Sequence, residues 1–378
     1  MFFYVVAGVT VGMGLYCAIS RGRAKSPRRP RPSLIFTVMY WLYTKTRVGY
    51  WYHHHLLTKA REKYPDGHSV TSAVTFGDLK VQPVAIISDN YSYVVMNTNR
   101  RIAVVVDPSD PEAVQTCVKQ EGVQLAAVLT THKHWDHSGG NHALKRMFPG
   151  LPIYGSATDG VPALTNPVVD GDVIQVGGLQ FQVLSTPGHT VGHVVYQLDG
   201  APFQAPNSLF TGDLLFIGGC GRTFEGDAAT MLKSLEKVSS QPDNTIIWPG
   251  HEYTLENLLY GETIDGDNES IREKLRWTKD RRKAKMATWN DLPGTVVTAP
   301  TVESYRARLE ACLHFVPRGC PSTVGDEKQH NVFLRTRDMA VAEAVGMATR
   351  RLTGVTEEFQ AGVLAALRER KDKFKIST

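Results

Sequence analysis

Four side chains that commonly bind metal ions lie within six residues of the chain, in the segment THKHWDH at 131–137. They are His132, His134, Asp136 and His137, and the whole chain of 378 residues has only 13 histidines. At this spacing four ligands cannot all be neighbours on one small ion, whereas two ions that each take a pair would use them all. The segment therefore predicts a two-metal centre of the kind that activates water for hydrolysis.

Further metal-binding side chains occur where other short apolar runs end. His189 lies in STPGHTVGH, Asp213 in LFTGDLLF and His251 in IIWPGHEY. A carboxylate such as Asp213 can bridge two ions through its two oxygens. Imidazole and carboxylate ligands without a thiolate suit Zn²⁺, and also Fe or Mn. A single histidine is as often a packing residue as a ligand, but seven such residues at strand ends favour a metal centre.

The elements that must position these residues are short strands and helices. Apolar runs bounded by Gly, Pro, Asp or Asn predict strands at 79–87, 91–96, 102–106, 125–129, 173–176, 179–184, 194–198, 208–210 and 245–248. Helical patterns are expected at 111–121, 140–148, 254–260, 268–285, 301–315, 338–350 and 357–372. The carboxyl ends of strands are where α/β folds display site residues. Alternation along the strand that enters 131–137 should place His132, His134 and Asp136 on one side, with a turn carrying His137 around.

These patterns together predict an α/β domain at 77–252 and a helical domain at 253–378, with an insertion near 286–319. Two histidines outside the candidate ligand set are expected to be structural. His193 follows His189 by four residues, and His142 lies in the helical pattern after the histidine-rich segment.

Taken together, the motifs carry a family resemblance. THxHxDH, the later histidines of TPGHT and PGHEY, and the aspartate of TGD are similar to the metallo-β-lactamase superfamily. The segments SDNYSY, VDPSDP, THKHWDHSGGN, GCGRTFEG and GHEY resemble the glyoxalase II type, whose members hydrolyse S-acylglutathione thioesters. The resemblance covers about residues 79–285 and 320–375.

The resemblance implies an αββα sandwich with a helical C-terminal domain over the site. It implies two divalent ions, most simply Zn²⁺, held by two sets of residues. The first set is His132, His134 and His189, the second is Asp136, His137 and His251, and Asp213 bridges both. Asp107 would orient ligands from outside the metal shell. Catalytic roles fall to Asp136 and Asp213, because hydroxide formed between the ions would attack the thioester carbonyl and release a thiolate.

The resemblance also implies a pocket for glutathione, which carries two carboxylates and one ammonium group and therefore needs cations and hydrogen-bond donors. The matching positions are Arg222, Phe224, Tyr253, Arg368 and Lys371. Two of them depart from the family: Arg222 stands where glyoxalase II commonly has lysine, and Phe224 replaces a tyrosine. Arginine keeps the charge but changes its geometry, so the preferred acyl group is left open.

The N-terminal segment differs in character from the rest of the chain. Residues 2–19 contain no charge and would span about 27 Å as a helix, close to the thickness of a bilayer core. Basic residues follow this run, which predicts a transmembrane anchor at 1–20, a basic and amphipathic linker at 21–76, and a catalytic domain facing the cytoplasm. A mitochondrial presequence is the alternative, because residues 1–61 contain no Asp or Glu. The aromatic stretch 33–57 favours an interfacial helix, and the adjacent His53, His54 and His55 are not expected to bind a metal.

Composition and charge narrow the function classes. Residues 1–63 carry a net charge of +10, and the remainder of the chain carries −5. Because the body of the chain is acidic, nucleic-acid binding is not expected. The five cysteines are scattered without CxxC spacing, which argues against a disulfide framework or a thiolate zinc site.

Two other functions stay open at this point. One is a mononuclear iron dioxygenase acting on glutathione persulfide, which would need only two histidines and one aspartate. The other is a membrane-anchored regulatory scaffold with reduced activity. The full set of seven candidate ligands favours the binuclear thioester hydrolase over both.

Overall fold

The computed structural model describes residues 34–284, 322–347 and 356–376. The chain divides into two compact units, Met1–His54 and His55–Thr378. The predicted anchor at 1–20 and the predicted insertion near 286–319 lie outside the described residues. Among the helices of the described ranges, none is both long and apolar enough to cross a bilayer.

The first unit contains helix α2 (Leu34–Lys45) and the beginning of helix α3 (Arg47–Lys63). The stretch expected as one interfacial helix is therefore two helices, which meet at Thr46. The Thr46 hydroxyl accepts a hydrogen bond from the Val48 N–H, as residues that start a helix often do. None of the α2 residues is buried, although the helix is rich in aromatic and aliphatic side chains.

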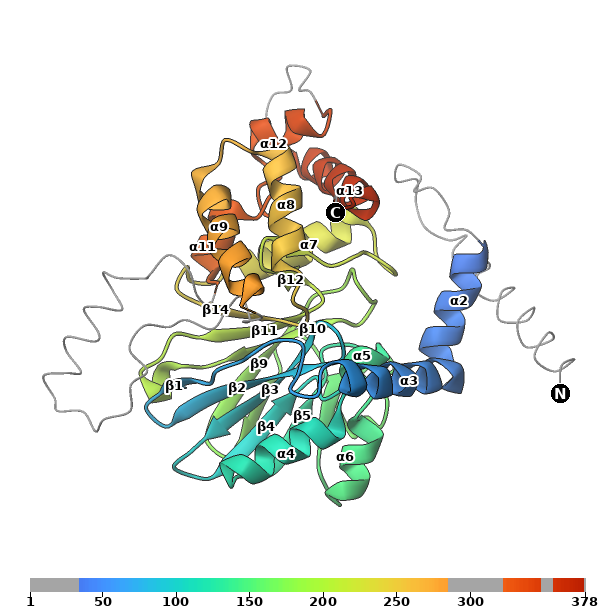
Figure 1. Ribbon diagram of the computed structural model, residues 1–378, viewed down its shortest axis with the longest axis vertical. Helices are drawn as coiled ribbons and strands as arrows, with labels where there is room; N and C mark the ends of the chain where they lie inside the picture. Colours follow the sequence, from blue (N-terminus) through green and yellow to red (C-terminus); the bar gives the residue numbers. More distant parts are fainter. Residues whose placement is uncertain (1–33, 285–321, 348–355, 377–378) are drawn as a thin grey trace, which may run out of the picture. The chain divides into compact units, whose positions relative to one another are not determined.

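The second unit is built on two sheets, and the first has seven strands in the order β1 to β7 (Figure 1). Its strands are β1 (Val74–Phe76), β2 (Leu79–Ile86), β3 (Asn90–Asn97), β4 (Ile102–Val106), β5 (Gln124–Leu129), β6 (Ile153–Ser156) and β7 (Asn166–Val168). Strands β1 to β4 are antiparallel neighbours, and β4 to β7 run parallel. Helix α4 (Pro111–Glu121) makes the crossover from β4 to β5, and α6 (Asn141–Met147) lies between β5 and β6.

The second sheet has five strands in the order β14-β11-β10-β9-β8. Its strands are β8 (Val173–Val176), β9 (Leu179–Ser185), β10 (Val194–Leu198), β11 (Ser208–Gly212) and β14 (Ile246–Pro249). A two-stranded ribbon of β12 (Leu215–Phe216) and β13 (Gly219–Cys220) follows β11. Strands β11 and β14 are parallel, so the residues that follow both emerge at one edge of the sheet.

Three apolar layers hold the sheets and helices together. The central one lies between the two sheets, where alternating strand residues such as Val95, Val104, Phe181 and Phe210 are fully or almost fully buried. A second layer joins the outer face of the first sheet to α4 and α6, and a third joins the second sheet to the remaining helices. This is the expected αββα sandwich (Figure 1).

Helices dominate the chain after β13. They are α7 (Ala228–Ser239), α8 (Thr254–Ile264), α9 (Glu269–Lys283), α11 (Val324–His330), α12 (Met339–Ala344) and α13 (Glu357–Lys373). Side-chain caps start several of them, including Asn268 at α9, Thr323 at α11 and Thr356 at α13. The sequence analysis did not predict α7 or α11. Helix α13 packs beside α7, and the Tyr260 hydroxyl of α8 donates to the Leu367 carbonyl of α13. The helical C-terminal region is thereby fixed to the second sheet.

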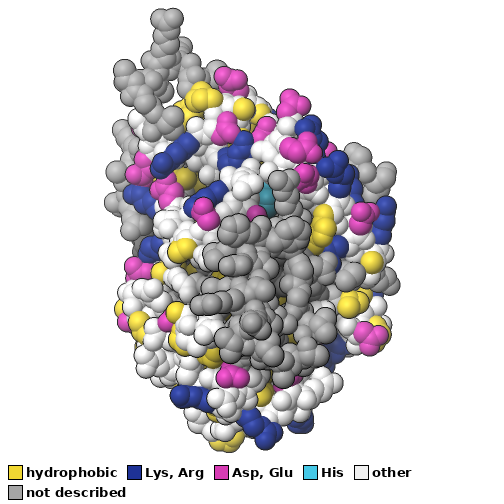
Figure 2. Space-filling view, turned by 90° about the vertical axis from the view of Figure 1, so that its left-hand side faces the viewer, with side chains coloured by type: hydrophobic (Ala, Val, Ile, Leu, Met, Phe, Trp, Pro, Cys, Tyr) yellow, Lys and Arg dark blue, Asp and Glu magenta, His cyan; other side chains and the backbone are white. Residues whose placement is uncertain are grey.

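Charge is mixed on the described surface seen in Figure 2, where Lys and Arg side chains alternate with Asp and Glu side chains.

Candidate metal centre

The candidate ligands lie at one edge of the sandwich, in the segments that follow four of its strands. The segment 131–137 follows β5, His189 lies between β9 and β10, Asp213 follows β11, and His251 follows β14. Strand β5 ends at Leu129, residues 131–133 form bends, and Trp135–Ser138 form the single helical turn α5 after the extended residue His134. The expected strand-like alternation of His132, His134 and Asp136 was therefore wrong, because the strand ends before His132 and a helical turn carries Asp136 and His137.

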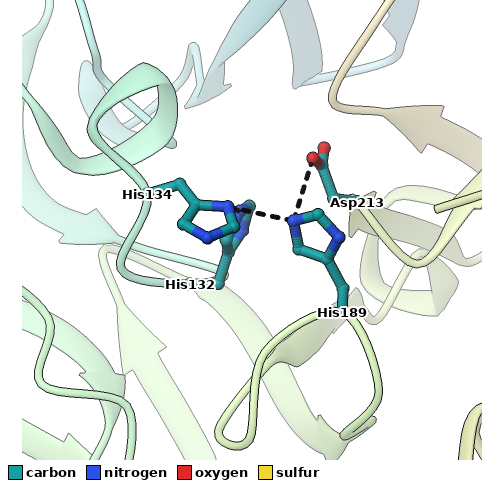
Figure 3. Close-up of side chains that lie close together, drawn as sticks. All are labelled: His132, His134, His189 and Asp213. Atoms are coloured by element: carbon teal, nitrogen blue, oxygen red, sulfur yellow. Dashed lines mark hydrogen bonds and ion pairs between the residues drawn. The ribbon is translucent and has the colours of Figure 1, made fainter. Parts of the chain in front are cut away.

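The first group of ligand atoms comes from His132, His134, His189 and Asp213, all of them buried (Figure 3). Nδ1 of His134 lies 3.0 Å from Nε2 of His132 and 3.0 Å from Nε2 of His189. Oδ2 of Asp213 lies 3.2 Å from the same Nε2 of His189. The three imidazoles and the carboxylate thus converge on one point.

The second group consists of Asp136, His137 and His251. Nε2 of His137 lies 3.3 Å from Nε2 of His251, and Oδ2 of Asp136 lies 3.8 and 3.5 Å from these two nitrogens. Oδ1 of Asp213 lies 3.2 Å from His137 Nε2 and 3.3 Å from His251 Nε2. Asp213 therefore directs one oxygen to each group, which is the arrangement of a bridging carboxylate.

The ligand atoms are arranged to bind a cation rather than to form hydrogen bonds with one another. His189 Nδ1 lies 2.8 Å from the Arg222 carbonyl, which only accepts, so Nδ1 carries the proton and Nε2 presents a lone pair. That lone pair faces an oxygen of Asp213, so two acceptors meet. Oδ1 of Asp213 is buried and has no hydrogen bond within the described residues. Tetrahedral ligands about 2.1 Å from Zn²⁺ lie roughly 3.4 Å apart, close to the separations in both groups.

Electrostatics differ between the two groups. Burial lowers the pKa of His132, His134 and His189, which keeps these imidazoles in the neutral form that binds metal. Burial also acts on His137, but Asp213, Asp136 and Asp107 outweigh it and raise the pKa of His137 to about 10. Protonation therefore competes with metal binding in the second group, and metal binding there would release protons.

The carboxylate of Asp213 is held in its charged form. Burial works against that form, but His251, His137 and His189 outweigh it and lower the pKa of Asp213 well below its usual range. A deprotonated carboxylate at this position is what bridging requires.

Residues outside the two groups fix the orientation of the ligands. Asp107 lies 2.9 Å from Nδ1 of His137 and also accepts from the Thr131 amide and hydroxyl, the supporting role that the resemblance implied. Asp89, which the sequence analysis missed, lies 2.8 Å from Nδ1 of His251. The Asp213 N–H donates to Nε2 of His193, in keeping with the structural role expected for that histidine. His137, His251 and Asp213 are thereby held in place by residues outside the ligand set.

Two glycines leave room for this arrangement. A Cβ at Gly250 would lie 2.7 Å from Cε1 of His137 and 2.8 Å from Oδ1 of Asp213. A Cβ at Gly221 would lie 1.8 Å from the Asp213 carbonyl oxygen. These positions exclude any side chain, since the backbone itself packs against the ligands.

The predicted substrate residues divide into two sets in the structure. Phe224 and Tyr253 touch the metal groups: the Phe224 ring lies 5.8 Å from His134 and 5.1 Å from His189, and the Tyr253 ring stacks on His251 at 4.7 Å. These aromatic rings form apolar walls beside the candidate ligands.

The three cations lie on α13 and on the loop before α7. Arg222 and Arg368 both pair with Asp372, at 3.3 and 2.7 Å, and Arg368 also donates to the Cys220 carbonyl. Lys371 pairs with Glu256 at 2.5 Å. Arg222 and Arg368 are thus brought together, and all three cations have carboxylate partners.

Comparisons with known proteins agree with this architecture. Residues 88–251 match the metallo-beta-lactamase superfamily, and residues 299–374 match the hydroxyacylglutathione hydrolase C-terminus. A hydroxyacylglutathione hydrolase of Rippkaea orientalis (strain PCC 8801 / RF-1) is 34% identical over 298 residues, which cover 78% of this chain and 100% of the relative.

Two solved structures are among those similar to this chain. BLEG-1 B3 metallo-beta-lactamase is 31% identical, with a TM-score of 0.39 over 46% of this chain and 91% of that chain. ETHE1 from Myxococcus xanthus is 24% identical, with a TM-score of 0.41 over 75% of this chain and 94% of that chain. The matched domains and the full-length match to the Rippkaea relative show that this chain belongs to the metallo-β-lactamase superfamily and, within it, to the hydroxyacylglutathione hydrolase (glyoxalase II) family.

Proposed function

We propose that the chain hydrolyses thioesters of glutathione at a binuclear metal centre. The observation that carries the proposal is the pair of ligand groups joined by the two oxygens of Asp213. A mononuclear dioxygenase would have no use for the second group of Asp136, His137 and His251. The family relationship to a hydroxyacylglutathione hydrolase supports the same reaction class.

The residues of the chain have separate tasks in this reaction. Two divalent ions would supply a water of near-neutral pKa and positive charge for the carbonyl oxygen. Asp136, which accepts a hydrogen bond from the Asn90 amide, would orient that water. Phe224 and Tyr253 border the centre with apolar surface, which excludes bulk water from the acyl group. The thiolate leaves without a dedicated acid, because it is a stable anion.

Glutathione would bind by replacing ion pairs that the cations make within the protein. The carboxylates of the tripeptide would replace Asp372 and Glu256 as partners of Arg222, Arg368 and Lys371. Burial lowers the pKa of Lys371, although Glu256 partly offsets this. The preference for glutathione then rests on α13 and on the loop that carries Arg222.

Zinc is the ion that best suits the proposed centre. The donors are imidazole nitrogens and carboxylate oxygens, without a thiolate, at separations that match tetrahedral Zn²⁺. Iron and manganese accept the same donors, so metal analysis of the purified chain decides between them.

Membrane attachment is a second part of the proposal. Residues 2–19 are long and apolar enough for an anchor, and the basic residues after them favour a catalytic domain on the cytoplasmic side. The exposed Leu34, Ile35 and Met39 of α2 support contact with a lipid surface. Cell fractionation tests this: resistance to carbonate extraction is expected, whereas cleavage of the segment on import into mitochondria would favour the presequence.

The proposed reaction is tested by comparing two thioesters of one acyl group. S-D-lactoylglutathione carries the carboxylates that the cations would bind, and a lactoyl thioester of N-acetylcysteamine lacks them. We expect metal-dependent hydrolysis with a far higher kcat/KM for the glutathione thioester. Equal rates for the two would contradict the assignment of glutathione, and absence of hydrolysis of either would contradict a thioesterase.

A further inference from the structure

Lys133 is a buried cation between two candidate metal ligands. Its neighbours in the chain are His132 and His134, and only 4% of its side chain is exposed. Its ammonium lies 2.7 Å from Glu225 and 3.5 Å from Oδ1 of Asp159. A buried charge is costly without a partner, so its position and the positions of its two carboxylate partners depend on one another.

The carboxylate partners of Lys133 also bind the backbone of the loop that carries His189. Glu225 accepts from the Val191 N–H at 2.9 Å, and Asp159 accepts from the Gly192 N–H at 3.1 Å. Asp159 accepts from the Lys133 N–H as well, at 2.7 Å. Lys133, Glu225 and Asp159 thus connect the segments that carry the three histidines of the first group.

The loop 221–226 serves the metal group and the proposed substrate site at the same time. The Arg222 carbonyl fixes Nδ1 of His189, and the Phe224 ring packs on His134 and His189. The Arg222 side chain reaches Asp372 beside Arg368. Backbone hydrogen bonds from Gly221 and Gly226 hold its two ends. Between these ends, Glu225 ties the loop to Lys133.

From these contacts we infer that the Lys133–Glu225 ion pair is a positioning device, which sets the loop 221–226 so that metal affinity and glutathione affinity change together. This inference rests on the proposed function for its substrate part. Release of the loop moves the carbonyl that orients His189 and, with it, the Arg222 and Phe224 side chains. The first metal group and the substrate site are therefore weakened by one change, whereas His137 and His251 of the second group are held by Asp107 and Asp89.

The test uses three variants of the full-length chain: Lys133→Met, Glu225→Gln and the double variant. Lys133→Met leaves the buried Asp159 and the partly buried Glu225 without their cation, so it should lower the unfolding midpoint most. Glu225→Gln leaves Lys133 with Asp159, and the double variant leaves Asp159 with its two amide donors. The double variant should therefore recover much of the unfolding midpoint. Lys80→Met is the matched control, because Lys80 pairs with Glu121 at 2.7 Å away from the ligand-bearing loops.

Two properties are measured on each protein. Titration of the chelator-treated chain with Zn²⁺ gives the affinity for each ion, and steady-state hydrolysis of S-D-lactoylglutathione at saturating Zn²⁺ gives KM and kcat. We expect the dissociation constant of one ion to rise on the order of 10- to 100-fold in all three variants, with the other ion little changed. KM should rise several-fold with a smaller change in kcat, and the control should match the wild type.

The double variant separates positioning from stability. Weak binding of one ion and a raised KM, despite a recovered unfolding midpoint, would support the inference. Recovery of metal affinity together with the midpoint would overturn it, because the pair would then only stabilise the fold. Wild-type metal affinity in Glu225→Gln would overturn it as well, even if Lys133→Met does not fold. The metal titration needs no turnover, so a chain that binds two ions but hydrolyses no thioester would contradict the proposed function, while the metal affinities of the variants would still test the ion pair.

Discussion

Asp213 is the single residue on which both candidate metal groups depend. Its two oxygens lie 3.2 Å from His189 and 3.2 Å from His137, which belong to different groups. We expect Asp213→Ala to lose both ions, with a drop in affinity beyond the roughly 10- to 100-fold typical of a residue that only supports a ligand. Metal content per purified chain is the measurement, and Asp243→Ala, at an exposed carboxylate paired with Lys328, is the control. An Asp213→Ala variant with full metal content and full activity would contradict the bridging role.

Gly250 lies where its backbone packs against His137 and Asp213. An added methyl would overlap His137 and Asp213, and overpacking of this kind typically costs about 1–3 kcal/mol. Gly250→Ala should therefore weaken one ion more than the other, as measured by Zn²⁺ titration. Gly261→Ala is the matched control, since its nearest contact would be an ordinary 3.7 Å in helix α8. Equal two-ion affinity in both variants would show that the ligands can shift without cost.

The ligands could be predicted from the sequence because four of them lie within six residues and the other three lie in distinctive motifs. Their supporting residues could not, because support depends on contacts across the chain. Asp89 and His251 are 162 residues apart, and Lys133 and Glu225 are 92 residues apart. No pattern in a single sequence indicates such pairs. Asp89 is a partial exception. It lies in the SDNYSY motif, and ligand histidines usually have an acidic partner, so a supporting role for it could have been predicted.

Helix α13 is the element that links stability to substrate binding. Leu364 is 2% exposed within the apolar layer against the second sheet, while Arg368 lies one turn further along the helix. Leu364→Ala should lower the free energy of unfolding by about 2–5 kcal/mol, as measured by denaturant titration. The loosened helix should also raise KM for the glutathione thioester. Glu357→Ala, at the exposed start of the same helix, should change neither, and a Leu364→Ala variant of wild-type stability would contradict the packing account.

The bounds of helices and strands with a strong hydrophobic pattern were predicted well. Very short strands and helix α7 were not predicted. The apolar runs at 102–106 and 125–129 match β4 and β5, and the helical pattern at 111–121 matches α4. Helix α7 was missed, although Asp227 caps it and its buried residues recur at helical spacing. Strands β6 and β7 have four and three residues and depend on pairing with neighbours, so local sequence gives little sign of them.

In the whole second unit, two sheets and a helical region meet at the edge that carries the candidate ligands. The sequence indicated an α/β region followed by helices, but strand order within each sheet came only from the structure. Residues that meet at this edge, such as His137 and His251, are 114 positions apart. The family resemblance predicted that these residues meet at one site, which helix and strand propensity and hydrophobic periodicity could not predict.

Metal binding should stabilise the whole second unit, because the ligands come from loops of both sheets. An ion present at 100 times its dissociation constant adds about 2.7 kcal/mol to the free energy of unfolding. Chelation should therefore lower the thermal unfolding midpoint, and added Zn²⁺ should restore it. The midpoint of an Asp213→Ala variant should not respond to chelator, which separates metal loss from other effects of the chelator. An unchanged midpoint in the wild-type chain would contradict a preformed centre.

The most direct test of the central claim is metal content per chain, measured together with hydrolysis of S-D-lactoylglutathione on the same preparation. The account predicts close to two ions per chain, with turnover that disappears on chelation and returns when metal is added back. One iron per chain, with oxygen consumption and no thioester hydrolysis, would contradict it.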